Sequence, residues 1–158
     1  MSRYASQTSV AVDRTRSEIE KLLGQHGASQ FAYASGTGKA MIGFLLAGRM
    51  IQMIVTLPDP TLDEFTLTTT GRKRRHPSDA YKLWEQSCRS RWRALLLVIR
   101  AKLEAAAIGV TTIESEFLAF TVLPDGRTVM DSIGEDIQHA IETGKTPRAL
   151  LPMLTGKQ

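Results

Sequence analysis

The apolar residues between positions 77 and 107 recur with the period of an α-helix, and this long run constrains the fold more than any other feature of the sequence. At 100° per residue they fall within an arc of about 100°. The members of this stripe are Tyr81, Trp84, Cys88, Trp92, Leu95, Ile99, Leu103 and Ala106. Pro77 suits the first turn of a helix and Gly109 suits its end. We therefore predict one helix over about 77–107, near 45 Å long at about 1.5 Å per residue.

Ahead of this helix the apolar residues alternate with a period of two, which is typical of β-strands. Phe31 and Tyr33 begin the alternation, and short turns at Gly36–Gly38 and Ala47–Gly48 separate three such segments. The second segment carries Ile42, Phe44 and Leu46, and the third carries Ile51, Met53, Val55 and Leu57. Three strands joined by short turns predict an antiparallel meander. The long helix is the natural cover for its apolar face.

The N-terminal part of the chain and the segment after the strands are less regular. A first helix is predicted over about 13–25, with Asp13 as its N-cap. Residues 1–11 are rich in Ser, Thr and Gln, and we expect a flexible arm there. The connection over 58–76 shows no apolar period, and a structureless loop of this length is usually functional or disordered.

The C-terminal third predicts two further helices. Thr111 and Glu114 have the spacing of a capping box, which predicts a short helix to about Phe120. Thr128 caps a last helix that ends near Gly144, and the tail over 145–158 is expected to be extended. The prediction is a single domain over 1–158 of the α+β class. It consists of an N-terminal helix, a three-stranded antiparallel β-meander, a long basic amphipathic helix and C-terminal helices.

Positive charge is concentrated in one fifth of the chain. Arg72 to Lys102 contain ten Lys or Arg and two acidic residues, whereas Leu103 to Glu142 contain eight acidic residues and one arginine. On a helical wheel four of the cations lie within about 40° of one another, on the flank of the apolar stripe. With the basic run before the helix, the predicted nucleic-acid-binding residues are Arg72, Lys73, Arg74, Arg75, Lys82, Arg89, Arg93 and Arg100.

A line of cations in which arginine dominates can follow the phosphates of a nucleic-acid strand. Two other interpretations stay open. The line is a solvated charged face, or it forms salt bridges with the acidic C-terminal third, within one subunit or between subunits.

Other motifs do not predict catalysis. Ser35–Lys39 lacks the spacing of a phosphate-binding loop and predicts a hairpin turn. Cys88 falls inside the apolar stripe, where a buried structural cysteine is expected, and the three histidines lack the spacing of metal ligands. Four carboxylates would hold Mg²⁺ in a nuclease only if they converged in space: Glu114, Glu116, Asp125 and Asp131. The prediction is a protein without catalytic residues, metal site or cofactor.

The composition predicts a location in the cytoplasm. No stretch approaches the ~20 apolar residues of a membrane span, and residues 1–12 lack the apolar run of a secretory signal. A single cysteine excludes an internal disulfide and favours a reducing compartment. We therefore expect no membrane partner.

Several segments resemble a family of small, uncharacterised phage-encoded proteins. The residues that carry the resemblance are Arg91–Leu95, Ala101–Ala105, Glu116–Ala119 and Leu123–Val129, and it covers most of residues 13–154. It implies a phage or mobile-element setting, hence the host-cell cytoplasm, and implies no catalytic residues. The expected order of a helix, a three-stranded meander and a long basic helix is also similar to the core of the single-strand annealing recombination proteins. That likeness is one of topology and implies rings or filaments that hold single-stranded DNA in a basic groove.

Three functions remain as hypotheses. The first is a non-enzymatic phage-type protein that binds or anneals single-stranded DNA in recombination or replication, as a homo-oligomer. Under this hypothesis the acidic C-terminal helices contact the basic region of a neighbouring subunit or limit the binding of nucleic acid. The second is a phage-encoded inhibitor or regulator that binds a host defence protein, and the third is a metal-dependent nuclease that uses the four carboxylates.

Overall fold

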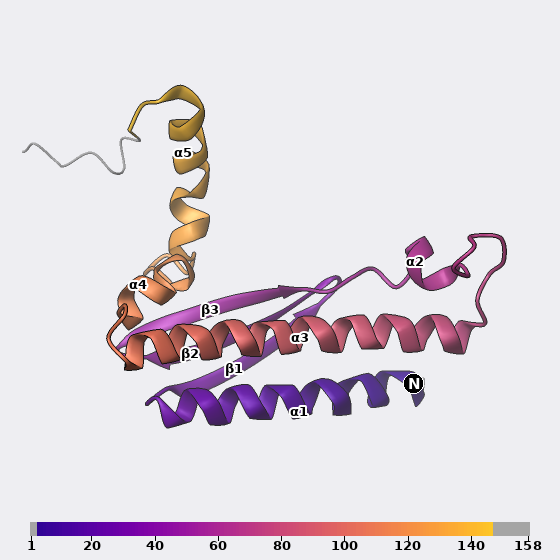
Figure 1. The fold of residues 1–158 in the computed structure, drawn as a ribbon. Helices are drawn as coiled ribbons and strands as arrows, with labels where there is room; N and C mark the ends of the chain where they lie inside the picture. Colours follow the sequence, from indigo (N-terminus) through magenta and orange to yellow (C-terminus); the bar gives the residue numbers. More distant parts are fainter. Residues whose placement is uncertain (1–2, 147–158) are drawn as a thin grey trace, which may run out of the picture.

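The computed structural model describes residues 3–146, with side chains from residue 12 onwards, and has an α+β architecture (Figure 1). A three-stranded antiparallel sheet forms one layer, and two long helices form the other. The elements in chain order are α1 (Arg3–Gln25), β1 (Ser29–Gly36), β2 (Lys39–Leu46), β3 (Arg49–Thr56), α2 (Asp63–Thr66), α3 (Pro77–Ala107), α4 (Ile113–Phe117), the 3-10 helix η1 (Leu118–Phe120) and α5 (Val129–Thr143). The predicted fold class is confirmed.

The sheet has the order β1-β2-β3, so the most apolar strand lies in the centre. Ile42 pairs with Met53 and Phe44 with Ile51, and all four side chains are buried beneath α1 and α3. The alternation seen in the sequence is therefore the alternation between the covered and the uncovered face. Residues 36–39 form the turn between β1 and β2, as the sequence predicts.

Helix α3 is the 31-residue helix expected over 77–107. Pro77 occupies its first turn, and the His76 side chain accepts a hydrogen bond from the Ser78 amide as N-cap. Its buried side chains are Cys88, Trp92, Leu96, Ile99 and Leu103. All of them except Cys88 pack in the core with the sheet and with Ile19 and Leu23 of α1.

Helix α1 is longer than predicted. It begins at Arg3, so the flexible arm expected over residues 1–11 is helical from residue 3 onwards. Asp13 is not an N-cap but lies inside the helix, where its carboxylate accepts a hydrogen bond from Arg16 at 3.3 Å. The physical reason is that no glycine or proline interrupts residues 3–23. Val12, which is buried, also continues the apolar stripe of Ile19 and Leu23.

The connection over 58–76 is ordered rather than structureless. It contains α2, whose Phe65 is buried, and a tight turn in which the Thr68 amide donates to the Lys73 carbonyl at 2.8 Å. Leu67 and Arg74 form an isolated β-bridge across this turn. One buried aromatic side chain and a closed backbone hydrogen-bond pattern explain the order, and neither gives a periodic signal in sequence.

The C-terminal helices begin at capped residues. Helix α4 is capped by Thr112, which accepts from the Ser115 amide, so the capping box predicted at Thr111 and Glu114 is wrong by one residue. Helix α5 is capped by Thr128, as predicted, and ends at Gly144 in the left-handed conformation (φ 68°). Most of the expected extended tail, residues 147–158, lies outside the described residues.

Replacing Thr128 with alanine is expected to destabilise α5 by about 1 kcal/mol. The Thr128 hydroxyl accepts from the Asp131 amide at 3.1 Å, and the Asp131 carboxylate accepts from the Thr128 amide at 3.2 Å. Hydrogen exchange checks this result, because the amides of α5 should exchange faster while those of β2 are unchanged. Ser132→Ala is the control, since the Ser132 hydroxyl has no hydrogen-bond partner among the described residues. Equal exchange in both variants would contradict the capping role.

Candidate nucleic-acid interface

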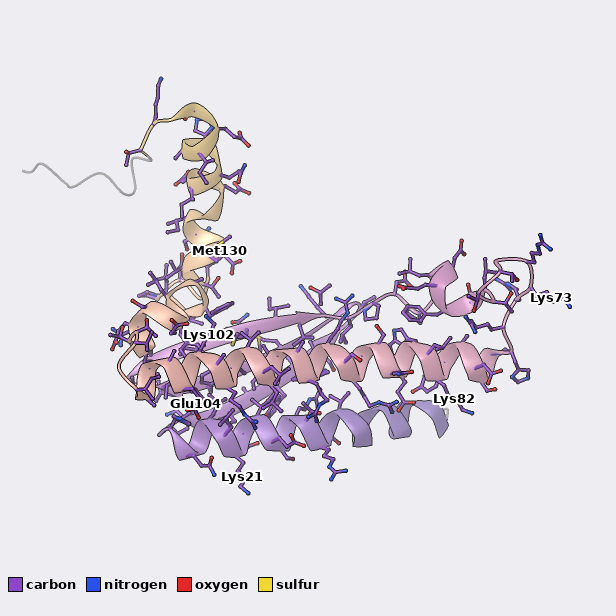
Figure 2. The ribbon with its side chains drawn as sticks, viewed as in Figure 1. Lys21, Lys73, Lys82, Lys102, Glu104 and Met130 are labelled. Atoms are coloured by element: carbon purple, nitrogen blue, oxygen red, sulfur yellow. The ribbon has the colours of Figure 1, made fainter. Side chains whose placement is uncertain are left out.

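The basic run lies on the turn that precedes α3. The turn closes through backbone hydrogen bonds from Thr68 to Lys73 and from Arg75 to Thr66. This backbone pairing leaves the side chains of Arg72, Lys73 and Arg74 exposed. Figure 2 shows Lys73 at the far end of the turn, beyond the first residues of α3.

A pocket of about 340 Å³ lies between this turn and α3. Its lining residues are Pro60, Thr66, Arg74, Arg75, Pro77, Ala80 and Tyr81. The Nε of Arg75 is buried and has no hydrogen-bond partner among the described residues. A buried donor without an acceptor costs about 1–3 kcal/mol. The pocket therefore combines two guanidinium groups with an aromatic ring, and the Nε of one guanidinium lacks an acceptor.

Tyr81 lines the pocket, but the sequence gives no sign of this role. Its place in the apolar stripe of α3 predicts a core residue, but the side chain is only half-buried and also lines the pocket. A tyrosine is uncharged at pH 7 in any case, and burial, with a smaller contribution from Glu85, raises the pKa of Tyr81 further. A neutral phenol is a surface on which a nucleic-acid base can stack.

Four further predicted residues lie along one side of α3. Lys82 and Arg100, at the two ends of this line, are exposed and are about 27 Å apart along the helix axis. Between them, Arg89 lies 3.4 Å from Glu85 and Arg93 lies 3.9 Å from Glu18 of α1. Both arginines keep an exposed side chain, 42% and 62% respectively, and exposed ion pairs are weak.

The turn and the helix residues are together called the cation line, although the turn lies on the α2 side of α3 and the four helix residues lie on the side of α1. It consists of Arg72, Lys73, Arg74, Arg75, Lys82, Arg89, Arg93 and Arg100. Within residues 12–146, six of the eight make no ion pair, the exceptions being Arg89 and Arg93. The turn adjoins the N-terminal end of α3, and Figure 2 shows Lys73 above the level of this helix and Lys82 below it.

Two other cations of the basic region have structural partners instead. The Arg91 guanidinium donates to the Thr56 carbonyl at 3.1 Å and so ties α3 to the end of β3. Lys102 donates to the carbonyl and carboxylate of Glu116 and lies 5.9 Å from the centre of the Phe117 ring. These contacts distinguish Arg91 and Lys102, which have structural partners, from the cation line. The positions of the residues in the sequence do not reveal this difference.

The carboxylates considered for a metal site have separate partners. Glu114 pairs with Arg49 at 3.0 Å, and Glu116 pairs with Lys102 at 3.2 Å. Asp125 pairs with Arg127 at 3.1 Å, and Asp131 accepts from the Thr128 amide. No group of three or more metal-ligating side chains occurs in the part of the chain that the structure describes. The feature that would support the nuclease hypothesis, a convergence of these carboxylates, is therefore not present.

Cys88 has the environment of a structural residue. Its side chain is buried in the core beneath α3. Burial, the largest influence, raises the pKa of the Cys88 thiol, although Arg91 acts in the opposite direction. A protonated, buried thiol is a poor nucleophile.

No protein-family model, curated protein or solved structure matches this chain. Within the described residues, no helix has both the length and the apolar character needed to cross a bilayer. The geometry of the cation line is thus the main evidence on function.

Proposed function

We propose that this protein is a non-enzymatic, phage-type protein that binds single-stranded DNA in recombination or replication, as a homo-oligomer in the host cytoplasm. The observation that carries the proposal is the cation line with the pocket at its turn. Six exposed or half-buried cations without ion pairs, four at the turn and two on the α1 side of α3, suit the charges of a phosphate backbone.

The pocket favours a single strand over a duplex. A phosphate bound by Arg74 and Arg75 would give the Arg75 Nε the acceptor that it lacks. A base turned towards the same pocket would meet Tyr81. In a duplex the bases are stacked and paired inside the helix, so only an unpaired strand offers base and phosphate together.

Fluorescence anisotropy with a labelled single-stranded oligonucleotide tests the proposal. With eight phosphate contacts, the affinity is expected to fall about 10³-fold between about 50 and 200 mM salt, because the logarithmic slope is about −0.7 per contact for a single strand. Duplex DNA and single-stranded RNA of the same sequence serve as competitors, and the duplex is expected to compete less well because its bases are paired and stacked. Absence of binding at low salt would contradict the proposal and favour a protein partner.

Arg89→Ala combined with Arg93→Ala is expected to weaken binding and to reduce the steepness of the salt dependence by about 1.4, or about 0.7 for each lost contact. Both side chains are largely exposed, so the fold should be unchanged, which circular dichroism checks. The matched control is Arg14→Ala with Lys21→Ala, because both residues are exposed on α1 and Figure 2 shows Lys21 pointing away from α3. An unchanged salt slope in the α3 variant would mean that Arg89 and Arg93 of α3 do not contact the nucleic acid.

A further inference from the structure

Helix α5 lacks the tertiary support that a helix of its length needs. It has 15 residues and no buried side chain, and its main contacts are with η1. Figure 1 shows it directed away from the sheet and from α3. An isolated helix of about 12–15 residues is only marginally stable in water. A partner that covers α5 would therefore stabilise it.

One side of α5 is apolar and only partly covered, because Ile133 and Ile137 are half-buried whereas Met130 and Ile141 are exposed. Met130, Ile133, Ile137 and Ile141 follow one another at intervals of three or four residues, which places them along one stripe. Met130 is 59% exposed and Ile141 71% exposed. The charged residues of the helix are all acidic: Asp131, Glu135, Asp136 and Glu142. Helix α5 is thus an acidic amphipathic helix whose apolar side is only partly covered.

Helix α3 carries a second, outward stripe that the core does not use. Its positions alternate in steps of four and three, as in a coiled-coil seam, and lie roughly opposite the buried Trp92 and Ile99. They are Ser90, Ala94, Leu97, Ala101, Glu104 and Ile108, the last directly after the helix. Leu97 is 62% exposed and Ile108 74% exposed, and the alanines between them would allow close approach of another helix.

The two stripes match in length and in charge. Helix α5 is about 22 Å long, and the outward stripe of α3 is about 27 Å long. Arg93 and Arg100 border the α3 stripe, whereas α5 carries four acidic residues and neither Lys nor Arg. Because α5 points away from α3 of its own chain (Figure 1), the complementary surface belongs to another copy.

We propose that α5 of one copy packs its apolar stripe along the outward stripe of α3 in a second copy of this chain. This interface specifies how the homo-oligomer of the proposed function forms. It rests on that oligomer and does not depend on nucleic-acid binding. Sedimentation velocity on the full chain without nucleic acid therefore tests it separately from the anisotropy assay.

Two single variants and their mixture test the interface. Leu97→Glu places a charge on the α3 stripe, and Ile137→Glu places one on the α5 stripe. We expect the wild type to sediment as a dimer or larger oligomer at about 100 μM and each variant as a monomer, since one added charge opposes burial of the stripe. An equimolar mixture should associate again, because the variant changed at residue 137 keeps an intact α3 and the one changed at residue 97 keeps an intact α5.

His139→Glu is the matched control, because residue 139 lies on the opposite side of α5 from the apolar stripe and the variant should stay oligomeric. Circular dichroism verifies that every variant is folded. A monomeric wild type would overturn the proposal, as would a mixture that stays monomeric. If Ile137→Glu alone dissociated the oligomer, α5 would bind the uncovered sheet face instead, and if Leu97→Glu alone did so, two α3 helices would pair. Either result would also overturn the proposal.

Discussion

A variant in which Arg74 and Arg75 are both replaced by glutamine is expected to bind single-stranded DNA about 100-fold more weakly than the wild type. Each lost charge-assisted hydrogen bond is worth about 1.5 kcal/mol, and about 1.4 kcal/mol corresponds to a factor of ten. Both residues line the pocket at the turn, and the buried Nε of Arg75 lacks an acceptor there. Anisotropy at a fixed salt concentration measures the difference.

The control for this variant is Arg14→Gln with Lys21→Gln, which removes the same charge from α1. Its expected loss is within about twofold, because neither residue lines the pocket at the turn and salt weakens the effect of charges outside it. Equal losses in the two double variants would mean that binding responds to net charge only. The pocket would then not be a binding site.

Trp92→Ala is expected to lower the free energy of unfolding by about 3–5 kcal/mol, a large part of the stability of a typical domain. Trp92 is 1% exposed and packs between the sheet and α1. The centre of its ring also lies 5.0 Å from the guanidinium carbon of Arg16. The same guanidinium carbon lies 5.3 Å from the centre of the Tyr33 ring. The substitution thus leaves a cavity and removes one of the two rings that hold a half-buried cation.

Urea denaturation followed by far-UV circular dichroism measures this change. Gln86→Ala is the control, because Gln86 is exposed on the same helix and its loss should alter the free energy by no more than about 0.5 kcal/mol. A midpoint for Trp92→Ala that matches the control would contradict the packing described for α3.

The strands and α3 could be predicted because their apolar residues have a local period. Ile42, Phe44 and Leu46 alternate along β2, and Trp92, Ile99 and Leu103 recur at helical intervals along α3. Both patterns arise from burying one side of a regular element, so each can be found within a short window of sequence. The cap of α5 was predictable for the same reason, since Thr128 and Asp131 are three residues apart.

The start of α1, the cap of α4 and the order within 58–76 could not be predicted in this way. Residues 3–11 have no strong apolar period, and Thr111 and Thr112 are equally good caps by residue type. The segment over 58–76 is ordered around one buried side chain, Phe65. Tertiary contacts and single hydrogen bonds decide such cases.

For the candidate site too, some features follow from local sequence and others depend on contacts between distant elements. The three strands, α3, the concentration of cations between 72 and 102, and the alignment of four of them on one side of a helix all follow from the residue order alone. The roles of Arg91 and Lys102 as internal ties, the approach of Arg93 to Glu18, and the pocket shared by Arg74, Arg75 and Tyr81 instead depend on how the elements pack. The physical reason is that helical position depends on near neighbours in the chain, whereas the partner of a charge depends on which distant elements the fold brings together.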